Sequence, residues 1–336
     1  MKTSSGLNRI NPVAYNLSVT GFIVLAIVLI GLFSYATKKI DYTWRWYKIP
    51  GYFYSNKSFD LNAEIKGVVK SITNSKGKII ITVNGSYGDE IYTLPESGKV
   101  LIDKGDVVYS GDTLARYKRW RLGLLGTGIL ITLKVSIYSS IIGIFIGIIG
   151  GIARISTNPA LKWSSICYIE LVRGSPLLVQ IFIWYFVFAT IFNKLLMSAG
   201  FHEISAMWYG IAALSTFAGA YVTEIVRSGI ESINIGQIEA SRSLGMTSAQ
   251  CMYYIVLPQA IRRILPPLAG QFITLIKDSS LLGIIAVREL TKATREGITT
   301  SLQPYEFWFV CAILYLVLTF TLSMFVQYLE RRMETP

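Results

Sequence analysis

Residues 239–258 read EASRSLGMTSAQCMYYIVLP and contain the most specific local signals in the chain. Gly245 can take the left-handed backbone conformation that ends a helix. Thr247 is then the N-cap of a second helix, and Gln250 three residues later completes a capping box. Pro258 has no backbone N–H, so we expect that second helix to end just before it. The stretch therefore predicts two short helices joined by a tight turn.

The composition around this stretch is that of a membrane protein. The chain has 336 residues, of which 52% are hydrophobic and 15% charged, against about 25% charged in an average soluble domain. This excludes a soluble globular protein and a disordered one. The net charge of +12 is spread between apolar blocks, which favours membrane topology over binding of nucleic acid. Cys167, Cys251 and Cys311 are too far apart to predict a disulfide framework or a zinc site.

Six apolar blocks are long enough to cross a bilayer, which takes about 20 residues. Five are free of charge: Asn11–Thr37, Val135–Ala153, Gly174–Asn193, Ile204–Thr223 and Phe307–Leu329. The sixth, Ile264–Val287, is interrupted by Lys277 and Asp278. The first block exceeds the h-region of a signal peptide and lacks a convincing cleavage site, so we expect it to remain as an anchor. We therefore predict six spans, with both chain ends on the same side of the membrane.

The distribution of Lys and Arg predicts which side that is. With both ends in the cytoplasm, the short inner segments carry more Lys and Arg than the short outer loops, which is the usual bias. Residues 1–16 are then a cytoplasmic tail, 17–37 an extra N-terminal transmembrane helix, and 38–121 an extracytoplasmic insert. That insert is itself rich in Lys and Arg, but long segments cross the membrane largely regardless of charge.

Within the insert, residues 43–115 predict a small β domain. Residues 78–83 and 90–94 are rich in β-branched or aromatic side chains and are followed by turn residues. Residues 98–115 contain two Gly-Asp turns and resemble one half of a biotinyl/lipoyl-type barrel-sandwich module. The sequence after Ala115 offers no lysine in the position of a carrier lysine. We therefore interpret the insert as a structural β module.

The stretch 239–258 resembles the coupling loop of permease subunits in ABC importers. In that family a Glu-Ala pair, a Gly, an aliphatic residue and Leu-Pro recur at fixed spacing, here Glu239, Ala240, Gly245, Ile255, Leu257 and Pro258. Ser241 stands where a third small residue is usual. The resemblance implies that this loop docks on an ATPase subunit and transmits its closure to the spans.

Three further stretches narrow the resemblance to permeases for polar amino acids: residues 168–180, 220–230 and 271–281. The resemblance runs from about Leu122 to Arg332. It implies an all-α polytopic membrane protein, a type I ABC importer permease core of five spans plus one extra N-terminal span, with a small all-β barrel-sandwich-like insert. We expect a transmembrane domain over 122–332, a coupling loop over 231–263, and core spans at about 128–152, 168–193, 204–226, 264–287 and 307–329.

The same resemblance implies a function and a set of partners. The chain would be the permease of an ATP-driven importer in a bacterial inner membrane, moving a polar amino acid delivered by an extracytoplasmic binding protein. Two ATPase subunits would bind ATP and Mg²⁺, and a second permease chain, identical or related, would complete the pathway. The chain has no G-x-x-x-x-G-K-[ST] loop and no catalytic constellation, so we expect no enzyme activity and no bound cofactor. Glutamine, glutamate, arginine and histidine all remain open as substrates.

Charged side chains within the spans are candidates for the transport pathway, because such groups normally face a bundle interior, a water-filled cavity or each other. Lys277 and Asp278 either line that pathway or form a local pair that stabilises the bundle. Two pairs three residues apart share a helix face and predict salt bridges at the membrane boundary, namely Glu224 with Arg227 and Glu170 with Arg173. Gly143, Gly147 and Gly151 predict a smooth strip for close helix packing.

Two hypotheses from other classes stay open at this point. A membrane-anchored assembly protein could use the β insert to recruit a partner, but this leaves residues 239–258 without a role. An ion-coupled transporter would show repeated halves or broken helices near the midplane, and the sequence has no internal repeat.

Overall fold

The computed structural model describes residues 12–75, 77–85 and 88–333. Residues 1–11 of the expected cytoplasmic tail lie outside the described part. The chain divides after Trp46 into two units, which are taken here in turn.

The first unit consists of one long apolar helix and the segment that follows it. Helix α1 (Pro12–Lys39) contains the candidate span Leu17–Lys39. Its large hydrophobic side chains are exposed on all sides, which is typical of a helix surrounded by lipid. After the helix, the rings of Trp44 and Trp46 stack with centroids 5.4 Å apart. Aromatic side chains of this kind are enriched at the membrane–water interface.

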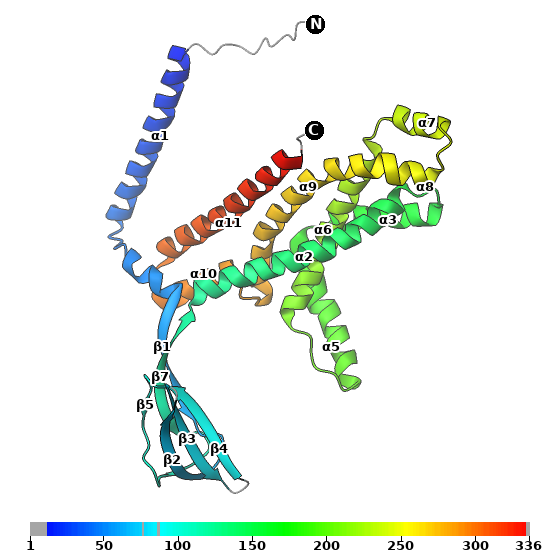
Figure 1. Ribbon diagram of the computed structural model, residues 1–336. Helices are drawn as coiled ribbons and strands as arrows, with labels where there is room; N and C mark the ends of the chain where they lie inside the picture. The colour runs from blue at the N-terminus through cyan, green and yellow to red at the C-terminus, as the bar shows by residue number, and fades with distance from the viewer. Residues whose placement is uncertain (1–11, 76, 86–87, 334–336) are drawn as a thin grey trace. The chain divides into compact units, whose positions relative to one another are not determined.

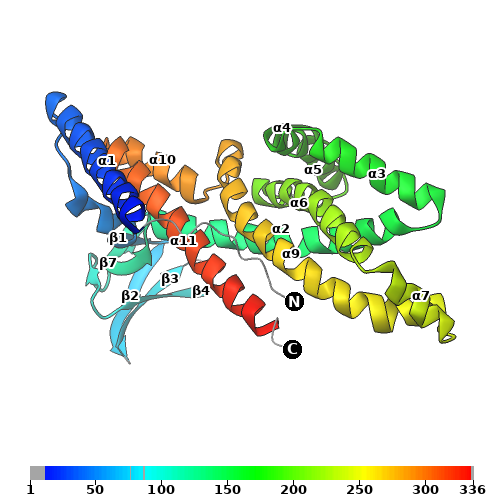
Figure 2. The same cartoon turned by 90° about the horizontal axis from the view of Figure 1, so that it is seen from above.

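The second unit is mainly helical (Figures 1 and 2). Its α-helices are α2 (Leu124–Ile155), α3 (Pro159–Arg173), α4 (Leu177–Phe182), α5 (Ala189–Ser198), α6 (Ala206–Glu231), α7 (Ile235–Ser243), α8 (Ser248–Cys251), α9 (Leu257–Asp278), α10 (Leu290–Ser301) and α11 (Pro304–Met333). Turns η1 (Trp46–Tyr52) and η4 (Ser279–Ile285) are 3₁₀-helical, whereas η2 (Ile183–Phe188) and η3 (Met252–Val256) are π-helical. Over the described residues of both units, 6 helices are long and apolar enough to cross a membrane, which confirms the predicted number.

The stretch 168–193 does not form the single continuous span that we expected. It breaks between α3 and α4, because Pro176 lacks the N–H that would continue the helix. The buried side chain of Gln180 closes the break by donating from Nε2 to the Val172 carbonyl at 2.6 Å and to the Ser175 hydroxyl at 2.9 Å. The candidate span therefore starts after the break, at Leu177–Ser198.

Helices α2 and α6 form the most extensive helix pair of the bundle (Figure 1). The predicted glycine strip on α2 lies directly against α6, and a Cβ atom at each glycine would meet an α6 side chain at 2.9 Å or less. The pairs are Gly143 with Ala218, Gly147 with Val222 and Gly151 with Val226. The strip therefore exists to let the two backbones approach, as predicted.

A buried carboxylate holds together the end of the bundle where α2 begins. Glu289 is fully buried and caps α10, accepting hydrogen bonds from the backbone N–H groups of Thr291 and Lys292 at 2.7 and 2.8 Å. The hydroxyl of Tyr315, on α11, donates to the same carboxylate at 2.9 Å. Next to it, the Leu290 N–H donates to the side chain of Thr132 on α2 at 3.1 Å. Burial raises the pKa of Glu289 above its usual value.

The insert is built of strands, as predicted. Its strands are β1 (Tyr54–Asn62), β2 (Gly67–Ser75), β3 (Lys78–Gly85), β4 (Gly88–Pro95), β5 (Lys99–Val100), β6 (Val107–Val108) and β7 (Thr113–Leu122). They form two antiparallel sheets, β1-β7-β5 and β4-β3-β2-β6, which share one apolar core. Both Gly-Asp turns are present, with Gly105 and Gly111 at φ +98°.

A two-stranded stem joins the insert to the bundle. We define it as residues 54–60 of β1 and 116–122 of β7, which pair in antiparallel register. At its base the Gly123 N–H donates to the Phe53 carbonyl at 2.7 Å, and the Tyr52 ring meets Phe307 of α11 edge-on, with centroids 4.8 Å apart. We call this end of the bundle the stem end and the opposite one, which carries α7 and α8, the loop end.

The glycine strip predicts a stability effect. The change Gly147→Ala places a methyl group 2.3 Å from the Val222 side chain and should lower the free energy of unfolding by about 1–3 kcal/mol. Thermal unfolding of the detergent-purified protein measures the change. The control is Gly270→Ala in α9, where a Cβ meets nothing within 4 Å. Equal stability of the two variants would contradict the close α2–α6 approach.

The buried carboxylate predicts a pH effect. Because the pKa of Glu289 is raised above its usual 4.5, the folded protein holds the proton that the unfolded chain has already lost. Its contribution to stability is complete below 4.5 and is lost as the pH rises through the raised pKa. We expect unfolding temperatures to fall less with rising pH in Glu289→Gln than in the parent protein. Parallel pH profiles would show that Glu289 does not titrate in this way.

Candidate coupling and transport sites

The loop end carries a helical hairpin, residues 234–251, formed by α7, a turn and α8. Gly245 has φ +83°, the left-handed conformation that the sequence predicted. The capping box is confirmed as well, because the Thr247 hydroxyl accepts from the Gln250 N–H while the Gln250 side chain accepts from the Thr247 N–H at 2.9 Å. Between the two helices, the Ser241 hydroxyl donates to the sulfur of Cys251 at 2.9 Å. The hairpin is thus held by local interactions.

Our expectation that the second helix ends before Pro258 is wrong. Helix α8 passes through the π-helical turn η3 directly into α9, and Pro258 lies in the first turn of α9. The Leu257 N–H bonds to the carbonyl of Met252, five residues earlier. A π-helical turn is wider than an α-helical one, and the first turn of a helix tolerates proline. The hairpin is therefore continuous with a transmembrane helix.

A buried apolar cluster joins the hairpin to the spans. It contains Cys251 and Val256 from the α8–η3 segment, Val226 from α6, Ile264 from α9 and Ile233 from the α6–α7 connection. Because close-packed side chains transmit displacement, a force applied to the hairpin acts on α6 and α9 together.

The hairpin and its base expose large apolar side chains. Leu244 is 84% exposed and Ile235 is 70% exposed. Tyr253 and Tyr254 on the adjoining π-helical turn are also largely exposed. Leu244 and Ile235 lie outside the candidate spans, so lipid facing a span does not account for their exposure.

The residues that the sequence singled out are divided between the hairpin and its base. Glu239, Ala240 and Gly245 are exposed on the hairpin. Ile255, Leu257 and Pro258 lie where η3 meets α9, with Ile255 and Leu257 half-buried and Pro258 exposed. The first three are thus accessible on the hairpin, and the last three lie at the joint between the hairpin and α9.

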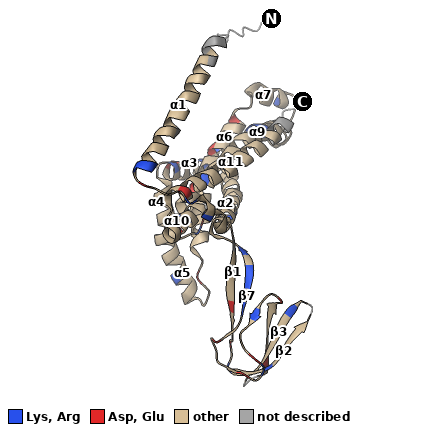
Figure 3. Cartoon of the chain, turned by 90° about the vertical axis from the view of Figure 1, so that its left-hand side faces the viewer, with Lys and Arg blue, Asp and Glu red and all other residues tan. Residues whose placement is uncertain are grey.

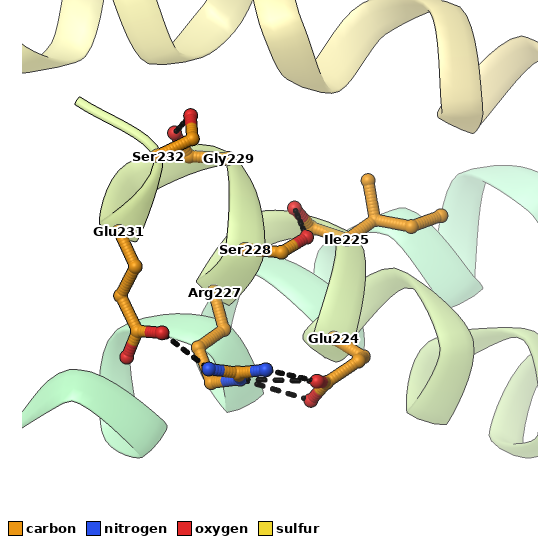
Figure 4. Close-up of polar contacts among 7 residues, drawn as sticks. All are labelled: Glu224, Ile225, Arg227, Ser228, Gly229, Glu231 and Ser232. Atoms are coloured by element: carbon orange, nitrogen blue, oxygen red, sulfur yellow. Dashed lines mark hydrogen bonds and ion pairs between the residues drawn. The ribbon is translucent and has the colours of Figure 1, made fainter.

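Charged side chains cluster at the loop end of α6 (Figure 4). Arg227 forms ion pairs with Glu224 and Glu231, and its Nε lies 3.1 Å from both carboxylate oxygens of Glu224. The predicted Glu224–Arg227 bridge is confirmed. The predicted bridge between Glu170 and Arg173 is wrong for the described chain, where Arg173 instead lies over the Tyr221 ring at 5.1 Å.

Next to this cluster lies a pocket of about 650 Å³ that combines charged and apolar side chains. Arg154, Lys162, Arg227 and Glu231 line it together with apolar side chains, including Met252 of η3. Within the described residues, the Nε atom of Arg154 is buried without a hydrogen-bond partner. The pocket therefore carries unneutralised positive charge between the ends of α2 and α3 and the hairpin.

Lys277 and Asp278 lie where α9 changes into η4. Lys277 is exposed and Asp278 is half-buried. Among the described residues they form no ion pair with each other or with any other side chain. The local-pair hypothesis therefore finds no bond to support it, and a role in the transport pathway stays a prediction.

Sequence reasoning missed two residues that organise the bundle. Gln180 ends the stretch 168–180, but nothing in that stretch marks it as the residue that closes the break before α4. Glu289 was not singled out, yet an acidic residue directly before a helical stretch is a recognisable cap signal. Only the fold shows that both side chains are buried.

Comparison with known proteins places this architecture in a family. Residues 143–335 match the family described as "Binding-protein-dependent transport system inner membrane component". The probable glutamine ABC transporter permease GlnP of Bacillus subtilis (strain 168) is 37% identical over 224 residues, which are 66% of this chain and 99% of that protein. The L-cystine transport system permease TcyB of the same organism is 36% identical over 212 residues, 63% of this chain and 87% of that protein.

A solved structure agrees with these relatives. A chain in a crystal structure of an amino acid ABC transporter with histidines is 36% identical and superimposes with a TM-score of 0.56. The match covers 62% of this chain and 94% of that chain. The family match begins within α2, so the insert and α1 lie before it. From the helical core shared with these proteins, we conclude that the chain belongs to the family of binding-protein-dependent transport system inner membrane components, the permease subunits of ABC transporters.

Proposed function

We propose that this chain is the permease subunit of an ABC importer that moves a polar amino acid into the bacterial cytoplasm after delivery by an extracytoplasmic binding protein. The observation that carries the proposal is the exposed helical hairpin 234–251, continuous with α9 and packed on α6. The similarity to permeases named for glutamine and L-cystine supports an amino acid as the substrate. The alternative of a membrane-anchored scaffold has no such support.

In this proposal the hairpin docks on an ATPase subunit. Its exposed apolar side chains, led by Leu244 and Ile235, would be covered by the ATPase, while Glu239 and Ala240 provide the contact surface of α7. ATP-driven closure of the ATPase would pull on the hairpin. Ile255, Leu257 and Pro258 would pass that movement to α9, because no flexible linker separates them from the membrane helix.

The assembly would contain two ATPase subunits and a second permease chain, identical to this one or related to it. The ATPase subunits would bind ATP and Mg²⁺, so this chain would need no cofactor. One chain supplies five core spans, and a pathway would form where two such cores meet. Symmetric homodimers are common among soluble oligomers, and a pair of related chains is equally compatible with the exposed helix faces.

The proposal also assigns the sides of the membrane. The loop end lies in the cytoplasm, where the ATPase subunits are, and so do both chain termini. The stem end and the insert then lie outside the inner membrane, on the side from which the binding protein arrives. The insert would be a half module of the barrel-sandwich type, a proposal supported by its two small sheets and paired Gly-Asp turns.

We assign Lys277 and Asp278 to the substrate pathway. The pair lies within the candidate span Ser248–Ile285, at a change from α-helix to 3₁₀-helix, and neither side chain has an ion pair in the described chain. Such groups inside a membrane normally face a polar interior. A zwitterionic amino acid carries both charges that these two side chains complement.

The docking proposal predicts the effect of one substitution. Gly245→Val forces a β-branched residue into φ +83°, which costs about 1–3 kcal/mol locally and should distort the hairpin. We expect loss of the ATPase subunit on co-purification of the tagged chain, and loss of ATP-driven uptake. The matched control is Gly200→Val, since Gly200 has φ +82° in the connection between α5 and α6. If the Gly245→Val variant is folded and still binds the ATPase subunit, the docking role of the hairpin is refuted.

The pathway assignment predicts a loss of transport without a loss of assembly. Asp278→Asn and Lys277→Gln should each reduce uptake of labelled amino acids by reconstituted transporter by about tenfold or more, while the ATPase still co-purifies. The control is Lys134→Gln, which removes an exposed cation from α2. If the control reduces uptake equally, then loss of any charge within a span lowers transport, and Lys277 and Asp278 are not assigned to the substrate pathway.

A further inference from the structure

The stem of the insert carries positive charge that the rest of the described chain does not neutralise. Strand β7 has Arg116, Lys118, Arg119 and Arg121 within six residues, and Figure 3 shows basic residues along this strand. Arg116 pairs with Asp60 on β1 at 2.5 Å. The other three form no ion pair with a described carboxylate.

The alternation of β7 divides these cations between two faces, because successive side chains point to opposite sides of a strand. Arg119 and Arg121 share a face with Tyr117. Phe59 lies directly opposite Tyr117 in the register of β1 and β7, and the guanidinium of Arg121 lies 4.3 Å from the Phe59 ring centre. This face is therefore both cationic and aromatic.

The same face opens onto a pocket at the stem end. The pocket has a volume of about 720 Å³ and is lined by Phe59 and Arg121 of the stem together with Arg288, Glu296 and Thr300 near or on α10. Within it, Arg288 is paired with Glu296 at 2.9 Å. Arg121 is left without a carboxylate, so the pocket has a net positive charge, and Arg119 lies on the adjoining part of the same face.

The opposite face of the stem has a different character. Tyr54 and Trp120 are exposed there, with Trp120 at 65%, and Lys118 shares this face by strand alternation. Tyr and Trp are the side chains that gather at a membrane–water interface, and these two lie close to the start of α2. The two faces of the stem therefore differ: aromatic side chains suited to the membrane–water interface lie on this one, and Arg119 and Arg121 lie on the pocket face.

We propose that the pocket face of the stem, centred on Arg119 and Arg121, is a docking surface for an acidic patch of the extracytoplasmic binding protein. The inference rests on the proposed function and adds a contact site outside the part of the chain that matches the family. The argument for this docking surface is charge complementarity, because unpaired Arg side chains beside aromatic rings are suited to bidentate binding of carboxylates. A pocket of this volume accommodates acidic side chains of a docked loop.

Docking at this site would reach the transport core through direct contacts. The base of the stem bonds to the start of α2 and packs on Phe307 of α11, and the pocket includes residues of α10. The binding protein would thus press on three helices that are bonded to one another around Glu289 and Leu290.

The test measures ATPase activity of the complete transporter in nanodiscs of neutral phosphatidylcholine, as a function of the concentration of the loaded binding protein that stimulates the parent. We expect the double variant Arg119→Gln/Arg121→Gln to raise the half-maximal concentration about tenfold and to weaken its salt dependence. Activity without binding protein should be unchanged. The control, Lys78→Gln/Lys104→Gln, removes two exposed cations from the insert outside the stem.

The outcomes separate this proposal from the proposed function. If no binding protein stimulates the parent, the proposed function fails. If one stimulates the parent and the double variant behaves like the control, the docking surface is refuted while the importer stands. If the effect of the double variant appears only when the nanodiscs contain phosphatidylglycerol, the stem binds anionic lipid and the proposal is also refuted.

Discussion

The close approach of α2 and α6 is the constraint on which the rest of the bundle depends. Three glycines at four-residue spacing bring the two backbones together, and a methyl group at any of them would meet an α6 side chain. In a bilayer, where apolar burial gives helices little reason to associate, such packing is a main source of affinity between them. Because α6 leads into α7 and α2 leads into α3, this one contact also positions both sides of the charged pocket at the loop end.

The coupling role proposed for the loop end depends on helix continuity. A hairpin stabilised by its own caps is rigid by itself, but it transmits force only if it is joined firmly to the membrane. The π-helical turn η3 makes that joint, because it carries the chain into α9 past Pro258 without a break. The buried cluster around Val256 and Ile264 then ties α9 to α6. The hairpin, the π-helical turn and the membrane helix α9 are thus continuous, and buried contacts join them to α6.

The stem end has an analogous organisation with different chemistry. There the buried carboxylate of Glu289 joins α10 to α11 through Tyr315, and the adjacent Leu290 N–H bonds to Thr132 of α2. The insert is attached beside it through Gly123 and Phe307. Both ends of the core therefore present a projecting element, a helical hairpin at one and a β stem at the other, and each is fastened to helices that lie side by side.

Local sequence patterns were enough to predict the elements whose causes are local. Six apolar blocks, the capped hairpin with its left-handed Gly245 and the strands at 78–83 and 90–94 all follow from hydrophobic length, caps and turn residues, and all are present. Only the tertiary structure decided how Pro176 and Pro258 act. The first breaks its helix while Gln180 satisfies the freed groups, and the second is carried within a continuous helix by a wide turn. Arg173 likewise lies against Tyr221 rather than pairing with Glu170. For each of these residues the result depends on side chains and turns that packing brings close. Rules that consider only neighbouring residues in the sequence cannot predict those contacts.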